Sequence, residues 1–248
     1  MDPREPSTFE RLVGLLTPMN EAQLARILSY AQGQVSPVFA EVDPDSALVT
    51  RAFADEFESR LRAHHALQSK PLGRVPFEDA FRAACEAAGR QLGPKLGATA
   101  SYIDLSVDGQ NFALKTTAAK DVRADYAHIS KLCEASWIQD VRGAADRQFK
   151  TKALFESYLG VTDRIVQLRV LPDPDAWVYQ LLEIPMHLFE PILKLGRDSF
   201  VADGPSIPVR DQDGECLTLK LDRSDAKITI ARIPVQRCLV HATWRLPK

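Results

Sequence analysis

The spacing of hydrophobic and polar positions changes about a hundred residues into the chain. Before that point, apolar residues recur every three or four positions, which is typical of helices that bury one face. Alternating positions become common after it, which is typical of strands. The predicted helices of the first part cover 9–16, 21–31, a stretch after Asp45 and a stretch from about Pro76 to Leu92.

The second part of the chain is predicted to be rich in strands. A helical zone with breaks is expected over 123–159, and a short helix over 186–195. This order of elements predicts a mixed β-sheet flanked by helices, an α/β or α+β fold. Residues 1–70 are expected to form a helical N-terminal region or subdomain, and 71–248 the core with a β-rich end. The predicted strands cover 100–106, 111–116, 164–171, 177–184, 216–221, 227–233 and 238–246.

The composition narrows the class of protein. Hydrophobic residues make up 45% of the 248 residues and charged residues 26%, and 31 Lys and Arg face 33 Asp and Glu. This balance excludes a generally basic nucleic-acid binder, although one basic face remains possible. The longest apolar runs are too short for a membrane helix, and the N-terminus has no apolar signal region. The four cysteines form no CxxC pair, so a reduced, cytoplasmic setting is expected.

The candidate functional residues lie in the segment from Tyr102 to Lys120. Two short predicted strands flank a turn over 107–110 there. Alternation places Phe112 and Leu114 on the core face of the second strand and leaves Ala113 and Lys115 on the other face. Asp104 is expected on the adjoining strand, near Lys115. A lysine beside a carboxylate can orient a water and stabilise an anion, and the carboxylate can bind Mg²⁺.

This arrangement resembles the PD-(D/E)xK motif of type II restriction endonucleases. Ile103-Asp104 is similar to the first element of that motif and Ala113-Leu114-Lys115 to the second, while 129–140 resembles a helix that follows it. The resemblance implies a restriction-endonuclease-like core and Mg²⁺-dependent, sequence-specific hydrolysis of double-stranded DNA. Asp104 and the residue at position 113 would then hold the metal, and Lys115 would orient the attacking water.

Ala113 departs from the motif, because the family has an acid at that position. The missing acid can have moved to Glu78, Glu86 or Asp108, and Glu86 or Glu78 can also act through a metal-bound water. The chain can instead be a natural relative that does not cleave, or an inactive variant in which an acid was replaced by alanine. We favour the last hypothesis, because the residues around Ala113 fit an active site.

Contacts to DNA are expected on both sides of the motif, and a two-fold symmetric recognition site would imply a homodimer. The alternatives are a DNA-binding module without catalysis and an unrelated α/β protein that acts on a small molecule or serves as an interaction domain. Candidates for reading base edges are Lys120, Asp121, Arg123, Gln139 and the loop 210–213. Candidates for phosphate contacts are Arg142, Arg147, Lys150 and Lys152.

Overall fold

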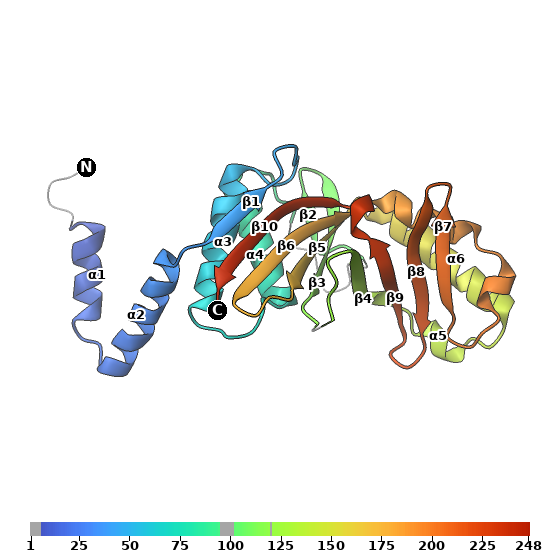
Figure 1. The fold of residues 1–248 in the computed structure, drawn as a ribbon, viewed down its shortest axis with the longest axis horizontal. Helices are drawn as coiled ribbons and strands as arrows, with labels where there is room; N and C mark the ends of the chain where they lie inside the picture. The colour runs from blue at the N-terminus through green and yellow to red at the C-terminus, as the bar shows by residue number, and fades with distance from the viewer. Residues whose placement is uncertain (1–5, 95–101, 120) are drawn as a thin grey trace.

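A six-stranded mixed sheet forms the centre of the molecule in the computed structural model, which describes residues 6–94, 102–119 and 121–248 (Figure 1). The strands lie in the order β1-β10-β6-β5-β3-β2. The β3–β5 pair is parallel and every other pair in this sheet is antiparallel. The predicted mixed sheet with flanking helices is therefore confirmed. The strands are β1 (Phe39–Val42), β2 (Leu105–Val107), β3 (Gln110–Thr117), β5 (Arg164–Leu171), β6 (Ala176–Ile184) and β10 (Leu239–Pro247).

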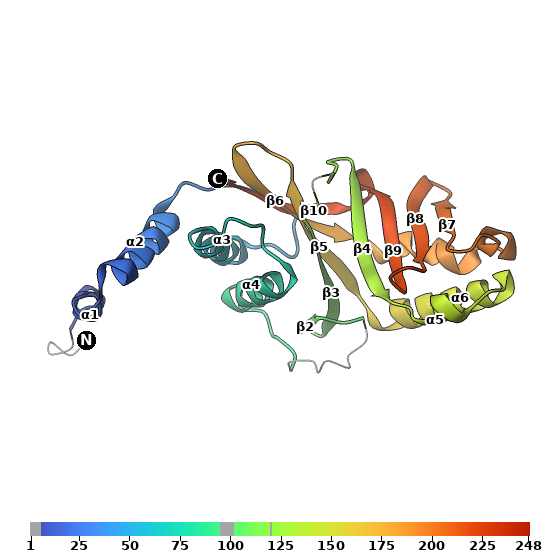
Figure 2. The ribbon, with the colours of Figure 1, turned by 90° about the horizontal axis from the view of Figure 1, so that it is seen from below.

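Two helices, α3 (Arg51–His65) and α4 (Arg74–Ala87), cover one face of this sheet (Figure 2). Each presents a stripe of apolar residues at helical spacing, and Phe57 and Phe81 are fully buried. These rings pack in one cluster with Leu114 of β3, which is the core face predicted for that strand. Strand β3 is therefore held on this face by a packed aromatic core.

A second sheet, in the order β4-β9-β8-β7, stands beside the first and shares a core with α6. The helix predicted from 123 onward, including the motif-following helix over 129–140, is wrong in its first part, because residues 126–134 form strand β4. Ala127 and Ile129 are buried and His128 and Ser130 exposed, so the segment alternates as a strand does. The elements of this half are β4 (Tyr126–Glu134), α5 (Trp137–Asp140), α6 (Ala144–Val161), β7 (Ser206–Asp211), β8 (Gly214–Asp222) and β9 (Lys227–Pro234).

Other differences from the sequence prediction are local. Strands β1 and β7 were not expected, and residues 100–101 of the predicted first strand lie outside the described residues. The helix predicted over 186–195 is a run of 3₁₀ turns, because Pro191 removes a backbone donor that a regular helix would use. The 3₁₀ turns of this stretch are η1 (Met186–Leu188) and η2 (Glu190–Lys194). Two further 3₁₀ turns follow, η3 (Arg197–Phe200) and, before β10, η4 (Val235–Arg237).

Helices α1 (Thr8–Leu16) and α2 (Glu21–Val35) extend away from the body as an arm (Figures 1 and 2). Both begin with a capping box, so their ends are locally stabilised, yet neither contains a buried residue. Phe9 and Val35 are exposed by 73% and 82%. Within the described residues α2 contacts the body at the end of α3, where Ser29 donates to the Ala66 carbonyl, and much of the apolar surface of both helices stays exposed.

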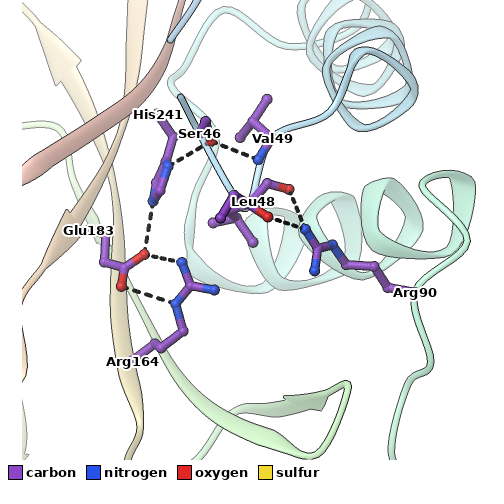
Figure 3. A network of polar contacts seen from close by, with 8 residues as sticks. Ser46, Leu48, Val49, Arg90, Arg164, Glu183 and His241 are labelled. Carbon is purple, nitrogen blue, oxygen red and sulfur yellow. Dashed lines mark hydrogen bonds and ion pairs between the residues drawn. The ribbon is translucent and has the colours of Figure 1, made fainter. Parts of the chain in front are cut away.

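A buried polar network fastens the loop after β1 to the sheet (Figure 3). Ser46 Oγ lies 2.8 Å from Nδ1 of His241, and Nε2 of the same ring lies 2.8 Å from the Glu183 carboxylate. Arg164 donates to the other carboxylate oxygen at 3.0 Å. The Ser46 hydroxyl also accepts the Val49 backbone N–H at 2.9 Å, so it acts as a turn cap rather than as an exposed nucleophile.

Candidate active site between the two sheets

The β2–β3 hairpin places Asp104 beside position 113. The predicted turn over 107–110 is confirmed, with Asp108 and Gly109 at φ 51° and 80°, as a tight two-residue hairpin turn requires. Just before β2, the backbone N–H of Asp104 donates to the carbonyl of Phe112 at 2.8 Å. The ladder therefore fixes Asp104 next to the strand that carries Lys115.

The Asp104 carboxylate accepts two hydrogen bonds and forms one longer ion pair. One oxygen accepts the backbone N–H of Leu114 at 2.7 Å and lies 3.7 Å from Nζ of Lys115. The other oxygen accepts Nη2 of Arg74 at 2.8 Å, and Nε of the same guanidinium donates to Glu78 at 2.7 Å. The predicted proximity of Asp104 and Lys115 is therefore present, with Arg74 of α4 as an additional cation.

Lys115 is a charged side chain in a restricted space, with 14% of its surface exposed. Burial lowers the pKa of its ammonium group, and the neighbouring Arg74 lowers it further, whereas the Asp104 carboxylate opposes that shift. A fixed cation in a poorly solvated position is the kind of group that stabilises charge on a bound anion.

A cleft of about 570 Å³ opens in front of this pair, between the end of α4, strand β3 and strand β4. Asp104 and Glu134 are the two carboxylates among the described residues that line it. The Lys131 ammonium lowers the pKa of Glu134, so that carboxylate is charged. Cys133 also lines the cleft, but burial raises its pKa to about 12 and keeps it a thiol.

Backbone strain accompanies the site. Tyr102, two residues before Asp104, has φ 71°, a conformation that is rare for a bulky residue. Its ring lies 5.2 Å from the buried ring of Tyr158, and its carbonyl accepts the hydroxyl of Thr162. Strained residues that persist in this way are common at functional sites.

Ala113 lies on the same face of β3 as Lys115, as predicted, but it is fully buried among apolar residues such as Ile129 and Ile165. The structure does not bring Glu86 to the cleft. At a helical rise of about 1.5 Å per residue, Glu86 lies about 18 Å along α4 from Arg74, which lines the cleft. Asp108 is also remote, since it binds Arg90 at the hairpin turn. Of the three alternative acids, Glu78 is joined to Asp104 through the Arg74 guanidinium.

The predicted DNA contacts fall in different places. Asp121 and Arg123 line a second cavity beside the cleft, and Lys120 lies outside the described residues. Gln139 and Arg142 contact each other at the surface near α5, away from both cavities.

The basic strip predicted over α6 needs one correction. Arg147 is buried, because its guanidinium binds Asp203 and the carbonyl of Phe200 inside the protein. Arg147 therefore forms a structural ion pair with Asp203, and its guanidinium cannot reach a phosphate. Lys150, by contrast, is exposed.

The chain is similar to known proteins over most of its length. The family model of the SmaI type II site-specific deoxyribonucleases matches residues 12–246. The chain belongs to this family. It is also 24% identical over 247 residues to the type II restriction enzyme SmaI of Serratia marcescens, covering 96% of this chain and 97% of that protein. No solved structure matches the chain.

Membership of the SmaI family makes the chain a type II site-specific deoxyribonuclease, with DNA as its substrate. No helix within the described ranges is long and apolar enough to span a membrane. Arg74 and Glu134 are not predicted from the sequence, because their positions in the cleft depend on how α4 and β4 pack against β3. The sequence signal for Arg74 is weak, since it lies two residues before Pro76, where the predicted helix begins.

Proposed function

We propose that the chain hydrolyses phosphodiester bonds of double-stranded DNA at the Asp104–Lys115 pair, in the manner of a PD-(D/E)xK nuclease, with Mg²⁺. The observation that carries the proposal is the hairpin ladder, which brings the carboxylate within 3.7 Å of Lys115 Nζ at the floor of an open cleft. An ordinary surface hairpin gives no reason for a mostly buried lysine at that point.

The donor set fits Mg²⁺ only together with the substrate. The described residues contain no group of three His, Cys, Asp or Glu side chains that could hold a metal by itself. Mg²⁺ is often held by one or two carboxylates, with substrate phosphates and waters completing its shell. Asp104 would be the fixed carboxylate here, and Glu134, which lines the same cleft, the second. When bound, the metal ion would supply charge neutralisation at the phosphate and a lower pKa for a bound water.

The remaining chemistry belongs to the chain itself. Lys115 faces the space in front of Asp104 and can donate to a phosphate oxygen or orient a water for attack. The Leu114 N–H and the Lys115 ammonium hold one carboxylate oxygen, which fixes the carboxylate plane. Arg74 neutralises the other oxygen while no phosphate is present.

We further propose that Ala113 marks the place of a lost acid, so that cleavage by this chain is slow until that acid is restored. Asp104 is hydrogen-bonded to the backbone on both sides of position 113, at Phe112 and Leu114, so a carboxylate there would stand beside it. Burial would raise the pKa of that carboxyl unless a metal ion or Lys115 compensated its charge.

The test is cleavage of supercoiled plasmid with Mg²⁺ by the chain, by A113D and A113E, and by each with Asp104→Asn. An acid at 113 is expected to raise the rate by several orders of magnitude, and D104N to abolish the gain. No gain in either variant would refute the lost-acid proposal. Loss of activity in E134Q or E78Q would then locate the second acid.

A DNA-binding module without catalysis is the alternative. Its signature would be tight binding of plasmid fragments in Ca²⁺ by the chain and by A113D, with no cleavage by any variant in Mg²⁺ or Mn²⁺. If D104N and Lys115→Met both cleave as fast as their parent, the assigned site is wrong even though the family is not.

We also propose that the chain works as a homodimer. One cleft can cleave one strand, and a duplex has two antiparallel strands, so two copies related by two-fold symmetry would cleave both. The arm of α1 and α2, with its exposed apolar residues, is suited to contact a second copy of this chain. Deletion of residues 1–36 removes no buried residue of α1 or α2 and should leave a folded monomer in analytical ultracentrifugation. A dimer that survives this deletion would show that the arm is not the interface.

A further inference from the structure

A second cavity continues the cleft along strand β3. It has a volume of about 500 Å³ and shares Thr116 and Ser130 with the first cavity. Lys115 and Thr117 lie on one face of β3, two residues apart, the first at the Asp104 cleft and the second in the new cavity. A DNA strand in the cleft can therefore extend into this neighbouring space.

Arg169 of β5 lines this second cavity, which we call the Arg169 cavity. The side chain is fully buried, and its Nη2 donates to the neutral carbonyls of Arg123 at 2.9 Å and Ala124 at 3.2 Å. Nε and Nη1 have no hydrogen-bond partner among the residues described. Burial lowers the pKa of this guanidinium. A buried cation with free donors is costly unless an anion completes its shell.

The rest of the Arg169 cavity favours an anion as well. Arg123 and Arg232 line it, and their guanidinium groups lie 5.6 Å and 4.9 Å from the ring centre of Tyr126. Asp121 is the one carboxylate among the described lining residues. Arg123 pairs with Asp125 and Arg232 with Glu215 at the rim, so Arg169 is the lining arginine without a carboxylate partner among the described residues. Thr117 adds a hydroxyl donor.

Strand β9 is distorted at the same place. Arg232 has φ 53°, and the β4–β9 register shifts between Ala127 and Ile129, which are the marks of a bulge. A bulge and a strained non-glycine residue recur beside ligand sites because they aim a side chain that a regular strand would turn away. This observation is independent of the charge of the cavity.

We propose that the Arg169 cavity binds a phosphodiester group of the DNA strand next to the reacting phosphate, and so positions that strand along β3. The inference rests on the proposed nuclease site, since that site defines where the reacting phosphate lies. Arg169 is then a positioning residue, which affects binding and KM more than kcat.

The test compares Arg169→Met with Arg147→Met. Both changes remove one buried arginine, but Arg147 binds Asp203 and lies outside both cavities. Binding of linear plasmid fragments is measured in Ca²⁺, where cleavage does not interfere, at several salt concentrations. R169M should bind about ten- to a hundred-fold more weakly, the range for a lost hydrogen bond to a charged group. Its salt slope should fall by about one phosphate contact. R147M should keep the affinity and slope of the parent.

Arg232→Gln covers the case in which R169M does not fold, because Arg232 is a half-exposed surface residue. It should also weaken binding and reduce the salt slope. Equal affinity and slope in R232Q, or in a folded R169M, would overturn the proposal. Inorganic phosphate is a second probe. If it stabilises the parent against heat but not R169M, and R169M keeps its affinity for DNA, the cavity binds free phosphate. That result would also overturn the proposal. Failure of the nuclease site would appear separately, as normal cleavage by D104N.

Discussion

Lys115→Met separates the catalytic role of Lys115 from a structural one. Methionine keeps the length of the side chain and its packing in the cleft, but removes the charge. If Lys115 is there to act on a phosphate, the chain retains it at a cost in stability, as active-site groups commonly require. The variant should then lose activity and keep its fold.

The expected change in stability follows from the contacts of Lys115. Its attraction to Asp104 across 3.7 Å is worth about 4.5 kcal/mol at an effective dielectric constant of about 20. The effective penalty for burying an ammonium group is several kcal/mol, which nearly cancels that gain. Asp104 also keeps its bonds to Arg74 and Leu114 after the change. We expect the free energy of unfolding to change by no more than about 1 kcal/mol.

The activity should respond very differently. Loss of one positioned donor to a developing negative charge lowers kcat by about a hundred- to a thousand-fold. The assay is plasmid cleavage with Mg²⁺, in whichever of the chain and its A113D variant cleaves faster, with urea unfolding of the same preparations. Arg51→Met, an exposed arginine paired with Asp55, is the control for removal of a cation. Destabilisation by more than about 2 kcal/mol together with normal cleavage would refute the reasoning, because Lys115 would then be a structural residue.

Three further predictions concern groups around the cleft and the core. Arg74→Gln frees one oxygen of Asp104, so half-maximal cleavage should need several-fold less Mg²⁺ in a metal titration; an increased requirement would contradict this. Burial lowers the pKa of His65 to about 4, so its stabilising contribution is complete above pH 6.5 and is lost as the pH falls toward 4. His65→Gln should flatten that part of the urea stability profile, and an unchanged slope would count against it. His241→Phe removes the contacts to Ser46 and Glu183 and should lower the unfolding free energy by about 1–3 kcal/mol, measured by urea unfolding; no loss would mean that the network is not stabilising.

The hairpin of the site could be predicted from the sequence because its signals are local. A turn that contains Asp108-Gly109 and alternation over 110–117 determine both strands and the face of each side chain. Strand β4 was mistaken for a helix because its partner, β9, lies about a hundred residues later in the chain. The contacts that select a strand there, between Ile129 and Ile230, have no counterpart near it in the sequence.

The cleft has the same long-range origin. Arg74 reaches Asp104 only because α4 packs on the β3 face that carries Leu114. Glu134 lines the cleft because β4, the edge strand of the second sheet, passes beside β3 of the first. Acids and cations separated by 30 residues or more cannot be assigned to one site from spacing alone, which explains why Glu86 was a candidate and Glu134 was not.

The net charge of the sequence does not show how charge is distributed over the folded chain. The total is −2, yet the described residues that line the two cavities carry six Lys or Arg side chains and three carboxylates. The surplus is local, in a concave region where low-dielectric walls strengthen its field. An acid restored at position 113 would reduce this surplus by one charge and leave it positive. The lost-acid proposal therefore requires that A113D still binds DNA in Ca²⁺ while it gains cleavage in Mg²⁺, because attraction and hydrolysis depend on different side chains of the same groove.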